Sequence, residues 1–335
     1  MTASSNKMAY PEINAFLHEL SVVRKLSTHT IKAYEQDLKK LIHFMSEQNI
    51  AVEAVTPLHT RSWMAKMHGA GLSARSIART ISAWRNFYQW LMLDAELNKR
   101  QIITVNPLGD LRAPKRPKNL PKALSVEQVM ALVDFAKKEA QSELEQFPIT
   151  SISKRVLVRD WALIELFYSS GLRLSEILGI DVQQKMSSTQ SSLGWIDWSS
   201  QEVNVLGKGG KRRIVPVGNA AMDALNVWRK TLIELAHPVE QALFVNEQFE
   251  RLSPRTVQAR LKKLAIRASL PTHVHPHMLR HSFASHVLQS SHDLRAVQEM
   301  LGHASIGSTQ IYTALDFQHL AQAYDLAHPR AKSNK

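Results

Sequence analysis

The 335-residue sequence contains no cysteine, which excludes disulfide bonds, zinc sites built on thiolates and cysteine nucleophiles. It also has no apolar run that approaches the roughly 18 residues of a membrane-spanning helix. The first residues of the chain are polar and lack the apolar core of a secretory signal peptide. Together these absences predict a cytoplasmic protein without a membrane partner.

Acidic residues are scarce relative to basic ones. There are 29 Asp and Glu against 42 Lys and Arg, which gives a formal net charge of +13. Residues 1–113 contain 14 Lys and Arg against 9 Asp and Glu, and residues 114–335 contain 28 against 20. Both parts of the chain are therefore basic. This favours a polyanionic partner such as nucleic acid, although an inert basic surface would have the same composition.

A segment rich in proline and lysine divides the chain. Residues 114–122 contain three prolines, each of which fixes its backbone φ and lacks an N–H donor, so no continuous helix can form there. We interpret this segment as a semi-rigid interdomain linker. It predicts one domain at residues 1–113 and another at residues 123–335, each long enough to bury its own core.

Hydrophobic periodicity predicts an all-helical bundle before the linker. Apolar residues recur every three or four positions over residues 28–45 and 73–93, and Thr56-Pro57 is a typical start of a further helix. The other face of the 73–93 helix carries three arginines, which we expect to be solvated or to meet phosphates. They are Arg75, Arg79 and Arg85.

After the linker the pattern predicts a mixed α+β domain that is mostly helical. Helices are expected from Ser125, over residues 155–168, and from Ala220 onwards. Between them we expect a small antiparallel sheet. Its strands are residues 193–198, 202–206 and 212–217, and the glycines at 207–211 permit a tight hairpin between the last two.

Six residues of this second domain have side chains suited to anion binding, proton transfer or nucleophilic attack. They are Arg173, Lys208, His277, Arg280, His303 and Tyr312. Arg173 follows a glycine at the expected start of a helix, where an anion would be favoured. Taken alone, Arg173 is better explained by an ordinary surface ion pair with Glu176.

The other members of the set are similarly open to two interpretations. Lys208 belongs to a basic cluster at residues 208–213, and the sequence does not say which member has a chemical role. His277 and Arg280 are three residues apart, which places them on one face of a helix. Taken singly, a histidine or tyrosine at such a position is more often packed and hydrogen-bonded than catalytic.

The order of the six residues resembles the active-site signature of the tyrosine recombinase (phage integrase) family. The segment His-Met-Leu-Arg-His-Ser-Phe-Ala at residues 277–284 is similar to the family's H-x-x-R box, and Leu-Gly-His at 301–303 with Tyr312 is similar to its last two boxes. The resemblance extends through both domains. It implies a SAM-like core-binding domain that binds DNA, followed by a catalytic domain.

The resemblance implies a chemistry as well. Tyr312 would attack a DNA phosphodiester and form a 3′-phosphotyrosyl link, while the two arginines and two histidines donate hydrogen bonds to the phosphoryl oxygens. His277 would be the base, and Lys208 the general acid that protonates the 5′-hydroxyl leaving group. Because the covalent link conserves the phosphodiester energy, no ATP or other nucleotide cofactor is expected. No metal is expected either, since the arginines and histidines would supply the charge compensation.

Residues 293–303 resemble the bacterial Xer recombinases, and residues 315–331 resemble the XerC branch of that group more than the XerD branch. This implies a short specific site on double-stranded DNA at which chromosome dimers are resolved. It also implies a heterotetramer with a XerD-like recombinase and control by a septal DNA translocase. Residues 317–327 have a helical pattern, and we expect them either to dock into a neighbouring subunit or to pack on their own domain.

The sequence leaves three alternative functions open. A phage or mobile-element integrase of the same family is one, although no arm-binding domain precedes residue 11. A metallohydrolase is suggested by the histidines at 273, 275, 277, 281 and 286, but there is no H-E-x-x-H motif and no carboxylate among them. A non-catalytic DNA-binding protein would leave the six residues unexplained.

Overall fold

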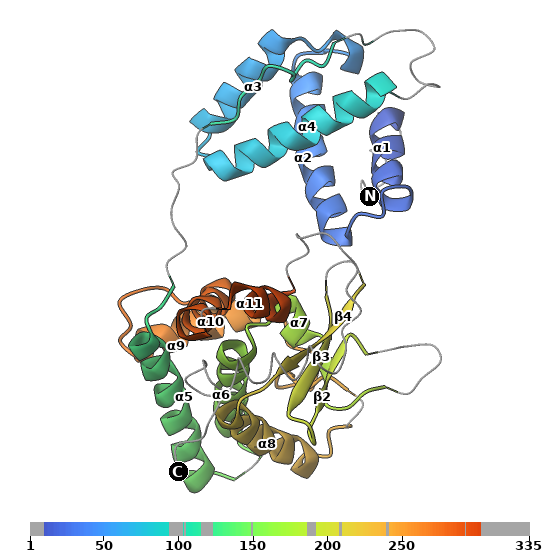
Figure 1. Ribbon diagram of the computed structural model, residues 1–335. Helices are drawn as coiled ribbons and strands as arrows, with labels where there is room; N and C mark the ends of the chain where they lie inside the picture. Colours follow the sequence, from blue (N-terminus) through green and yellow to red (C-terminus); the bar gives the residue numbers. More distant parts are fainter. Residues whose placement is uncertain are drawn as a thin grey trace. The chain divides into compact units, whose positions relative to one another are not determined.

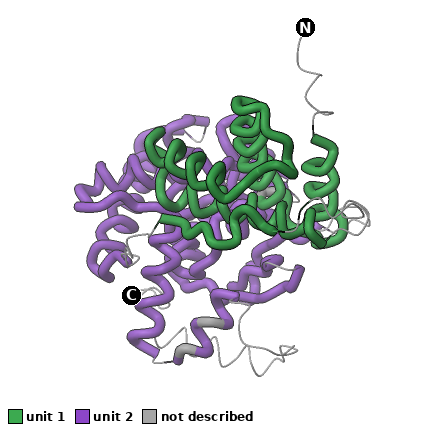
Figure 2. Tube along the Cα trace, turned by 90° about the horizontal axis from the view of Figure 1, so that it is seen from above, with its two compact units in different colours: residues 1–119 green, residues 120–335 purple. Residues whose placement is uncertain are grey.

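The computed structural model describes residues 10–93, 103, 105–114, 123–148, 150–185, 192–207, 210–238, 241–291 and 293–302. The chain forms two compact units, Met1–Asn119 (unit 1) and Leu120–Lys335 (unit 2), which are coloured separately in Figure 2. All of the predicted linker except Pro114 lies outside the described residues, so the linker and its domain boundaries stay predictions.

Unit 1 is built from helices, as predicted. They are α1 (Pro11–Val22), α2 (Thr28–Glu47), the 3₁₀ turn η1 (Val52–Ala54), α3 (Pro57–Gly69) and α4 (Ala74–Leu93) (Figure 1). α2 begins where the hydroxyl of Ser27 accepts a hydrogen bond from the N–H of Thr30. α3 begins at the predicted Thr56-Pro57 pair, with the Thr56 hydroxyl accepting from the N–H of His59.

The core of unit 1 encloses a carboxylate. Asp37 of α2 is 0% exposed and accepts hydrogen bonds from Nε and Nη2 of Arg79 at 2.8 and 3.1 Å. Arg85 donates to the backbone carbonyls of Leu108 and Leu111. The prediction that the arginines of α4 face solvent or phosphates is wrong for Arg85, whose guanidinium binds carbonyls within unit 1. Arg79 pairs with Asp37, but its side chain is 50% exposed, as expected of a solvated face.

Along the chain of unit 2, helices come both before and after a small sheet. The helices are α5 (Val126–Gln146), α6 (Ile152–Ser170), α7 (Leu174–Leu178), α8 (Asn219–Glu234), α9 (Pro254–Arg267), α10 (Pro276–Ser291) and α11 (Leu294–Leu301). The predicted start at Ser125 is confirmed, since its hydroxyl accepts from the N–H of Gln128 while the Gln128 side chain accepts from the N–H of Ser125.

The predicted sheet is present, with one addition. Its strands are β1 (Ile180–Asp181), β2 (Gly194–Asp197), β3 (Glu202–Leu206) and β4 (Arg212–Pro216), in that order. β2, β3 and β4 pair antiparallel as expected, and the short β1 pairs parallel with β2, so the sheet is mixed. Side chains alternate along β4: Arg212 and Ile214 are exposed, while Arg213 and Val215 are buried.

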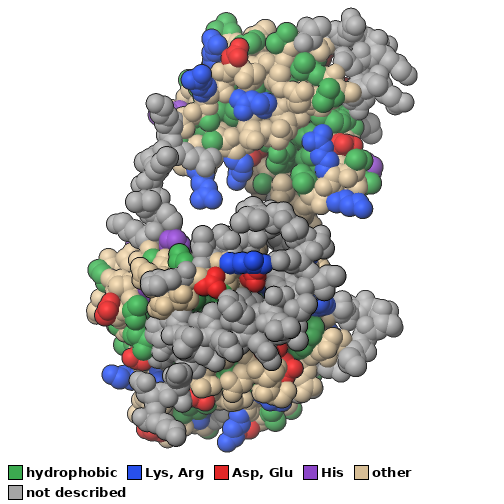
Figure 3. Space-filling view, viewed as in Figure 1, with side chains coloured by type: hydrophobic (Ala, Val, Ile, Leu, Met, Phe, Trp, Pro, Cys, Tyr) green, Lys and Arg blue, Asp and Glu red, His purple; other side chains and the backbone are tan. Residues whose placement is uncertain are grey.

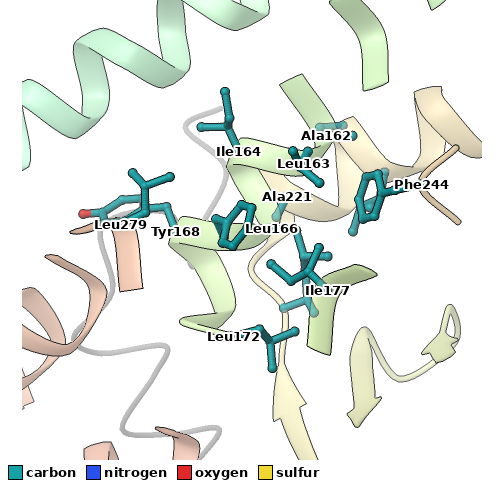
Figure 4. Close-up of a cluster of buried hydrophobic side chains, with 14 of the residues drawn as sticks. Ala162, Leu163, Ile164, Leu166, Tyr168, Leu172, Ile177, Ala221, Phe244 and Leu279 are labelled. Carbon is teal, nitrogen blue, oxygen red and sulfur yellow. The ribbon is translucent and has the colours of Figure 1, made fainter. Parts of the chain in front are cut away.

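Helix α6 runs through the core of unit 2. From Val158 to its end every residue is buried, because apolar side chains face α5, α8 and α10 on different sides. Figure 4 shows Leu166 and Tyr168 of α6 among side chains contributed by other elements, including Ile177 of α7 and Leu279 of α10. The ends of α6, α7 and α10 are thereby held on one common core.

The first described residues of unit 2 are attached to α10. The N–H of Leu124 donates to Oγ of Ser282 at 2.9 Å, and Nε2 of His286 donates to the carbonyl of Leu124 at 3.0 Å. Since Nε2 of His286 carries the proton, its Nδ1 accepts from the hydroxyl of Tyr168 at 3.0 Å. The predicted fold class, a helical bundle joined to a mostly helical α+β domain, is confirmed.

Candidate active site

Three of the six predicted site residues lie in the part of the chain that the structure describes. Arg173 precedes α7, and His277 and Arg280 are on α10. Lys208, His303 and Tyr312 fall outside the described residues, although the chain is described up to Leu206-Gly207 before Lys208 and up to Gly302 before His303. The site is therefore built from Arg173, Arg280 and the side chains around them.

Arg280 is held by backbone carbonyls at the ends of two other helices. Its Nη1 donates to the carbonyl of Gly171, just after α6, and its Nη2 donates to the carbonyl of Leu301, the last residue of α11, each at 2.6 Å. Arg280 is 8% exposed. The backbone at Gly171 is left-handed, with φ +58°, and an added Cβ would lie 2.2 Å from the ring of Phe283. A glycine is therefore required where Arg280 binds.

Arg173 also binds a carbonyl at the end of α11, next to the one that holds Arg280. Its Nη1 donates to Oε1 of Glu176 at 2.8 Å and its Nη2 donates to the carbonyl of Gly302 at 3.3 Å. The expected ion pair with Glu176 is confirmed. The helix that Arg173 opens has only five residues, so its dipole contributes little, and the positive charge of this location comes from side chains.

Two further residues belong to this cluster and were not singled out from the sequence as site residues. Glu176, 8% exposed, receives Nη1 and Nη2 of Arg213 on its two carboxylate oxygens at 2.9 and 2.8 Å. Nε of Arg213 donates to the carbonyl of Met300 in α11 at 3.1 Å. Alternation along β4 puts Arg213 on the same face as the buried Val215, but the sequence alone does not distinguish this face from the one that carries Arg212 and Ile214.

The electrostatics of the cluster are dominated by positive charge. Burial lowers the pKa of Arg280 to about 10; the charges of Arg173 and Arg213 also lower it, and Glu176 opposes them. Arg280 stays protonated at neutral pH because that pKa is well above 7. Burial by itself would raise the pKa of Glu176, but hydrogen bonds and charge from Arg213 and Arg173 outweigh it and hold the pKa below its ordinary value. Two guanidiniums thus contact one ionised carboxylate, and the charge of that carboxylate also acts on Arg280.

The histidines of α10 have different environments. His277 is exposed in the first turn, within reach of solvent and three residues before Arg280. Nδ1 of His275 accepts from the N–H of Met278, and burial followed by the nearby His277 lowers the pKa of His275. His286 uses both ring nitrogens inside the core. Among the described residues, no group of three or more His, Asp or Glu is arranged to hold a metal ion.

What this arrangement can do chemically is to hold an anion. Arg280 and Arg173 come from α10 and α7, which are more than a hundred residues apart in the chain, and both guanidiniums are fixed by carbonyls at residues 301 and 302. Fixed planar donors of this kind bind phosphoryl oxygens and cost no reorganisation when charge develops.

No helix of the described chain is long and apolar enough to cross a membrane.

Comparison with known families decides the assignment. The phage integrase family matches residues 122–319, which includes all six predicted site residues, and the phage integrase N-terminal SAM-like domain matches residues 13–94. The chain belongs to the phage integrase family. The recombinase is 50% identical over 330 residues to tyrosine recombinase XerC 1 of Ralstonia nicotianae, covering 96% of this chain and 94% of the relative. It is 42% identical over 322 residues to tyrosine recombinase XerC of Pseudomonas aeruginosa, covering 96% and 95%.

Solved structures share the fold of the recombinase. The XerH site-specific recombinase bound to the palindromic difH substrate, in a post-cleavage complex, has a TM-score of 0.64 at 21% identity and covers 94% of this chain and 83% of that one. A λ integrase(75–356) dimer bound to a COC′ core site has a TM-score of 0.59 at 16% identity and covers 91% and 98%. The predicted enzyme class is confirmed: the protein is a site-specific DNA recombinase of the tyrosine type.

Proposed function

We propose that the recombinase cuts DNA with Tyr312 as its nucleophile and keeps the cut end as a 3′-phosphotyrosyl link. The Tyr312 oxygen forms a bond to phosphorus, the bond from phosphorus to the 5′-oxygen breaks, and a proton is delivered to that oxygen. A second 5′-hydroxyl reverses these steps on another strand. Because each step exchanges one phosphoester bond for another, the sequence of steps needs no ATP. We assign the charge compensation that a metal would give to the cationic side chains of the site.

The observation that carries this proposal is the convergence of Arg173 and Arg280. Both guanidiniums are tied to the carbonyls of residues 301 and 302, the last two described residues before His303. We assign Arg173 and Arg280 to the non-bridging oxygens of the scissile phosphate, since a planar fork matches a phosphoryl group. His303 follows directly in the chain, and we assign it and the exposed His277 as further donors, with His277 as the base.

Lys208 completes the proposed set as the general acid for the 5′-oxygen. It follows β3 and Gly207, whose N–H donates to the carbonyl of Lys211 at 2.8 Å across the turn to β4. Its neighbour Arg213 is excluded from this role because its guanidinium is buried against Glu176 and Met300. Arg212 is also engaged within the protein, because it donates to the carbonyl of Ser192 and lies over the ring of Trp195 at 4.9 Å, so we do not assign it this role.

The test is the capture of the covalent adduct. The protein is incubated with DNA sites that carry a nick close to the cleavage point, in EDTA and without ATP. After cleavage the short fragment with the 5′-hydroxyl diffuses away from the nicked strand, so the adduct accumulates. We expect wild-type protein to attach to DNA through the peptide containing Tyr312, and Tyr312→Phe to bind DNA without attachment. Tyr324→Phe, which changes the next tyrosine in the chain, is the matched control and should form the adduct. An adduct in Tyr312→Phe, or a labelled peptide with another tyrosine, would refute the assignment.

The role of Arg280 has a separate test in Arg280→Lys. Lysine keeps the positive charge, but one ammonium on a flexible stem does not reproduce two diverging bonds to the carbonyls of Gly171 and Leu301. We expect single-turnover cleavage to fall by roughly 10²–10³-fold, the typical loss of a preorganised donor. DNA affinity, measured by gel shift, should change far less. Wild-type cleavage in this variant would remove Arg280 from the site.

We propose that double-stranded DNA is the substrate and that α9 contributes to its binding. Arg255, Lys262 and Lys263 are exposed on this helix, and lysine and arginine side chains also project at several places on the face of unit 1 seen in Figure 3. Each phosphate contact that is lost should lower the slope of log affinity against log salt by about one. Lys262→Gln should show this change, and an unchanged slope would exclude Lys262 from the interface.

We further propose that the site is a short chromosomal sequence at which dimeric chromosomes are resolved, with a XerD-like recombinase as the partner in a heterotetramer and a septal DNA translocase as regulator. The support is that relatives with the XerC name align with 96% of this chain. Residues 317–327, proposed to dock into a neighbouring subunit, lie outside the described residues. Deletion of the gene should produce unresolved chromosome dimers and filamentous cells, which the Tyr312→Phe protein should not rescue.

A further inference from the structure

Arg213 joins three parts of the proposed site. It lies on β4, the strand that follows the turn containing Lys208, and it bonds both to Glu176 of α7 and to the carbonyl of Met300 in α11. Figure 1 shows β4, α7 and α11 next to one another at one side of unit 2. All three nitrogens of the Arg213 guanidinium already donate within the protein, Nε to Met300 and Nη1 and Nη2 to Glu176, so we do not assign Arg213 to a bound phosphate.

The contacts of Glu176 show what Arg213 does there. Oε1 of Glu176 accepts from Nη1 of Arg173 at 2.8 Å and from Nη1 of Arg213 at 2.9 Å. Oε2 accepts from the backbone N–H of Arg173 and from Nη2 of Arg213, both at 2.8 Å. The carboxylate is therefore divided between two arginines. One of them is buried, while the side chain of Arg173 is 29% exposed and can face a ligand.

Removing Arg213 would change the charge that Arg173 presents. A buried carboxylate without its first partner binds the remaining one more strongly, because an unpaired buried charge is costly. Arg173 would then be neutralised by Glu176 and drawn towards it. The carbonyl of Met300 would lose its donor as well, in the last turn of the helix whose following residues, 301 and 302, bind Arg280 and Arg173.

We propose that Arg213 is a positioning residue of the recombinase: it neutralises Glu176 and fixes the end of α11, so that Arg173 keeps both its charge and its place for the scissile phosphate. This inference rests on the proposed function. Gly302 supports it by its shape, since an added Cβ would lie 3.1 Å from three atoms of the Arg213 guanidinium, so the two residues are in close contact.

The experiment compares single-turnover adduct formation on nicked DNA at saturating protein, with DNA affinity measured separately. We expect Arg213→Gln to bind DNA within a few-fold of wild type and to form the adduct about 100-fold more slowly, the loss that a displacement of about 1 Å produces. Arg213→Lys, which keeps the charge but not the fork, should lose about tenfold and provides a second variant with smaller perturbation of the fold.

A double variant separates charge balance from mere structural support. If Arg213 acts by neutralising Glu176, then Glu176→Gln introduced into Arg213→Gln should speed adduct formation at least tenfold over Arg213→Gln alone. If Arg213 is only part of the scaffold, the second substitution should add a further loss. A matched control is Arg159→Gln, because Arg159 is also buried, pairs with the Asp160 carboxylate through two nitrogens and donates to one carbonyl, that of Val245.

A substrate with sulfur in place of the 5′-oxygen identifies the step. Sulfur leaves without a proton donor, so a residue that acts through Lys208 becomes unimportant on this substrate. We expect Arg213→Gln to stay about 100-fold slower than wild type with the sulfur substrate. Recovery of the wild-type rate there, wild-type rates with the natural substrate, or a further loss in the double variant would overturn the proposal. If wild-type protein forms no adduct at Tyr312, the proposed function fails first and this inference fails with it.

Discussion

Replacing Gly171 with alanine should destabilise unit 2 through two separate effects. The first is conformational, since φ is +58° at this position and the left-handed region costs a residue with a Cβ roughly 1–2 kcal/mol. The second is steric. The added Cβ would lie 2.2, 2.7 and 2.9 Å from three ring atoms of Phe283, which is 0% exposed.

The size of the combined effect can be worked out from these two parts. Overpacking a closed core costs roughly 1–3 kcal/mol, so the two effects together should lower the free energy of unfolding by about 2–5 kcal/mol. A unit of this size loses roughly 2–4 °C in melting temperature per kcal/mol, which predicts a fall of about 4–20 °C. Cleavage should fall too, because Arg280 donates to the carbonyl of Gly171.

The assay is thermal unfolding followed by circular dichroism, with Gly210→Ala as the control. Gly210 also has a left-handed backbone, with φ +77°, but an added Cβ there meets nothing within 4 Å. This control should therefore show the conformational cost alone, about 1–2 kcal/mol. If Gly171→Ala loses no more stability than Gly210→Ala, the packing of Phe283 against residue 171 is not as described and the steric argument is refuted.

Three further substitutions test other parts of the molecule. Burial lowers the pKa of His286 in the folded protein, so the unfolded state binds the proton more readily. The free energy of unfolding should therefore fall as the pH drops below about 6.5. His286→Gln should reduce this fall, which thermal melts between about pH 7.5 and 5 would measure. Asp37→Asn should destabilise unit 1 by roughly 1.5–3 kcal/mol in urea titrations, because charge-assisted bonds to a buried carboxylate are lost, whereas Glu35→Gln in an exposed pair should be neutral. Gly302→Ala should slow adduct formation about tenfold, since φ is +63° there and the new Cβ would press on Arg213; a wild-type rate would contradict this contact.

Local patterns explain most of what the sequence predicted correctly. α2, α4 and α6 have apolar residues at helical spacing, and Thr56-Pro57 and Ser125 begin helices through bonds to residues three positions away. β1 was not predicted because two residues are too few for any periodic pattern, and its parallel partner β2 begins fourteen residues later. The same limit applies to Arg79, whose partner Asp37 is 42 residues away.

The candidate site shows the same division between local and distant information. The order of the six residues identified the family, and Arg173 with Glu176 could be paired because they are three residues apart. The carbonyls that hold Arg280 are at residues 171 and 301, and such backbone acceptors have no signature in the side chains. Arg213 was recognised only as one of several basic residues near the hairpin, because a buried arginine and a solvated one are the same letter in a sequence.

The contact between Arg213 and Gly302 has a consequence for how this enzyme can be altered. The Arg213 guanidinium lies 3.1 Å from the position that a Cβ at residue 302 would take, and it also binds Glu176. A substitution at any one of residues 176, 213 and 302 therefore affects the other two. A smaller side chain at 213 would free room for a larger one at 302 but would leave the carboxylate at 176 without its partner. Engineered variants, or chimeras that exchange β4 between recombinases, should therefore transfer all three positions together.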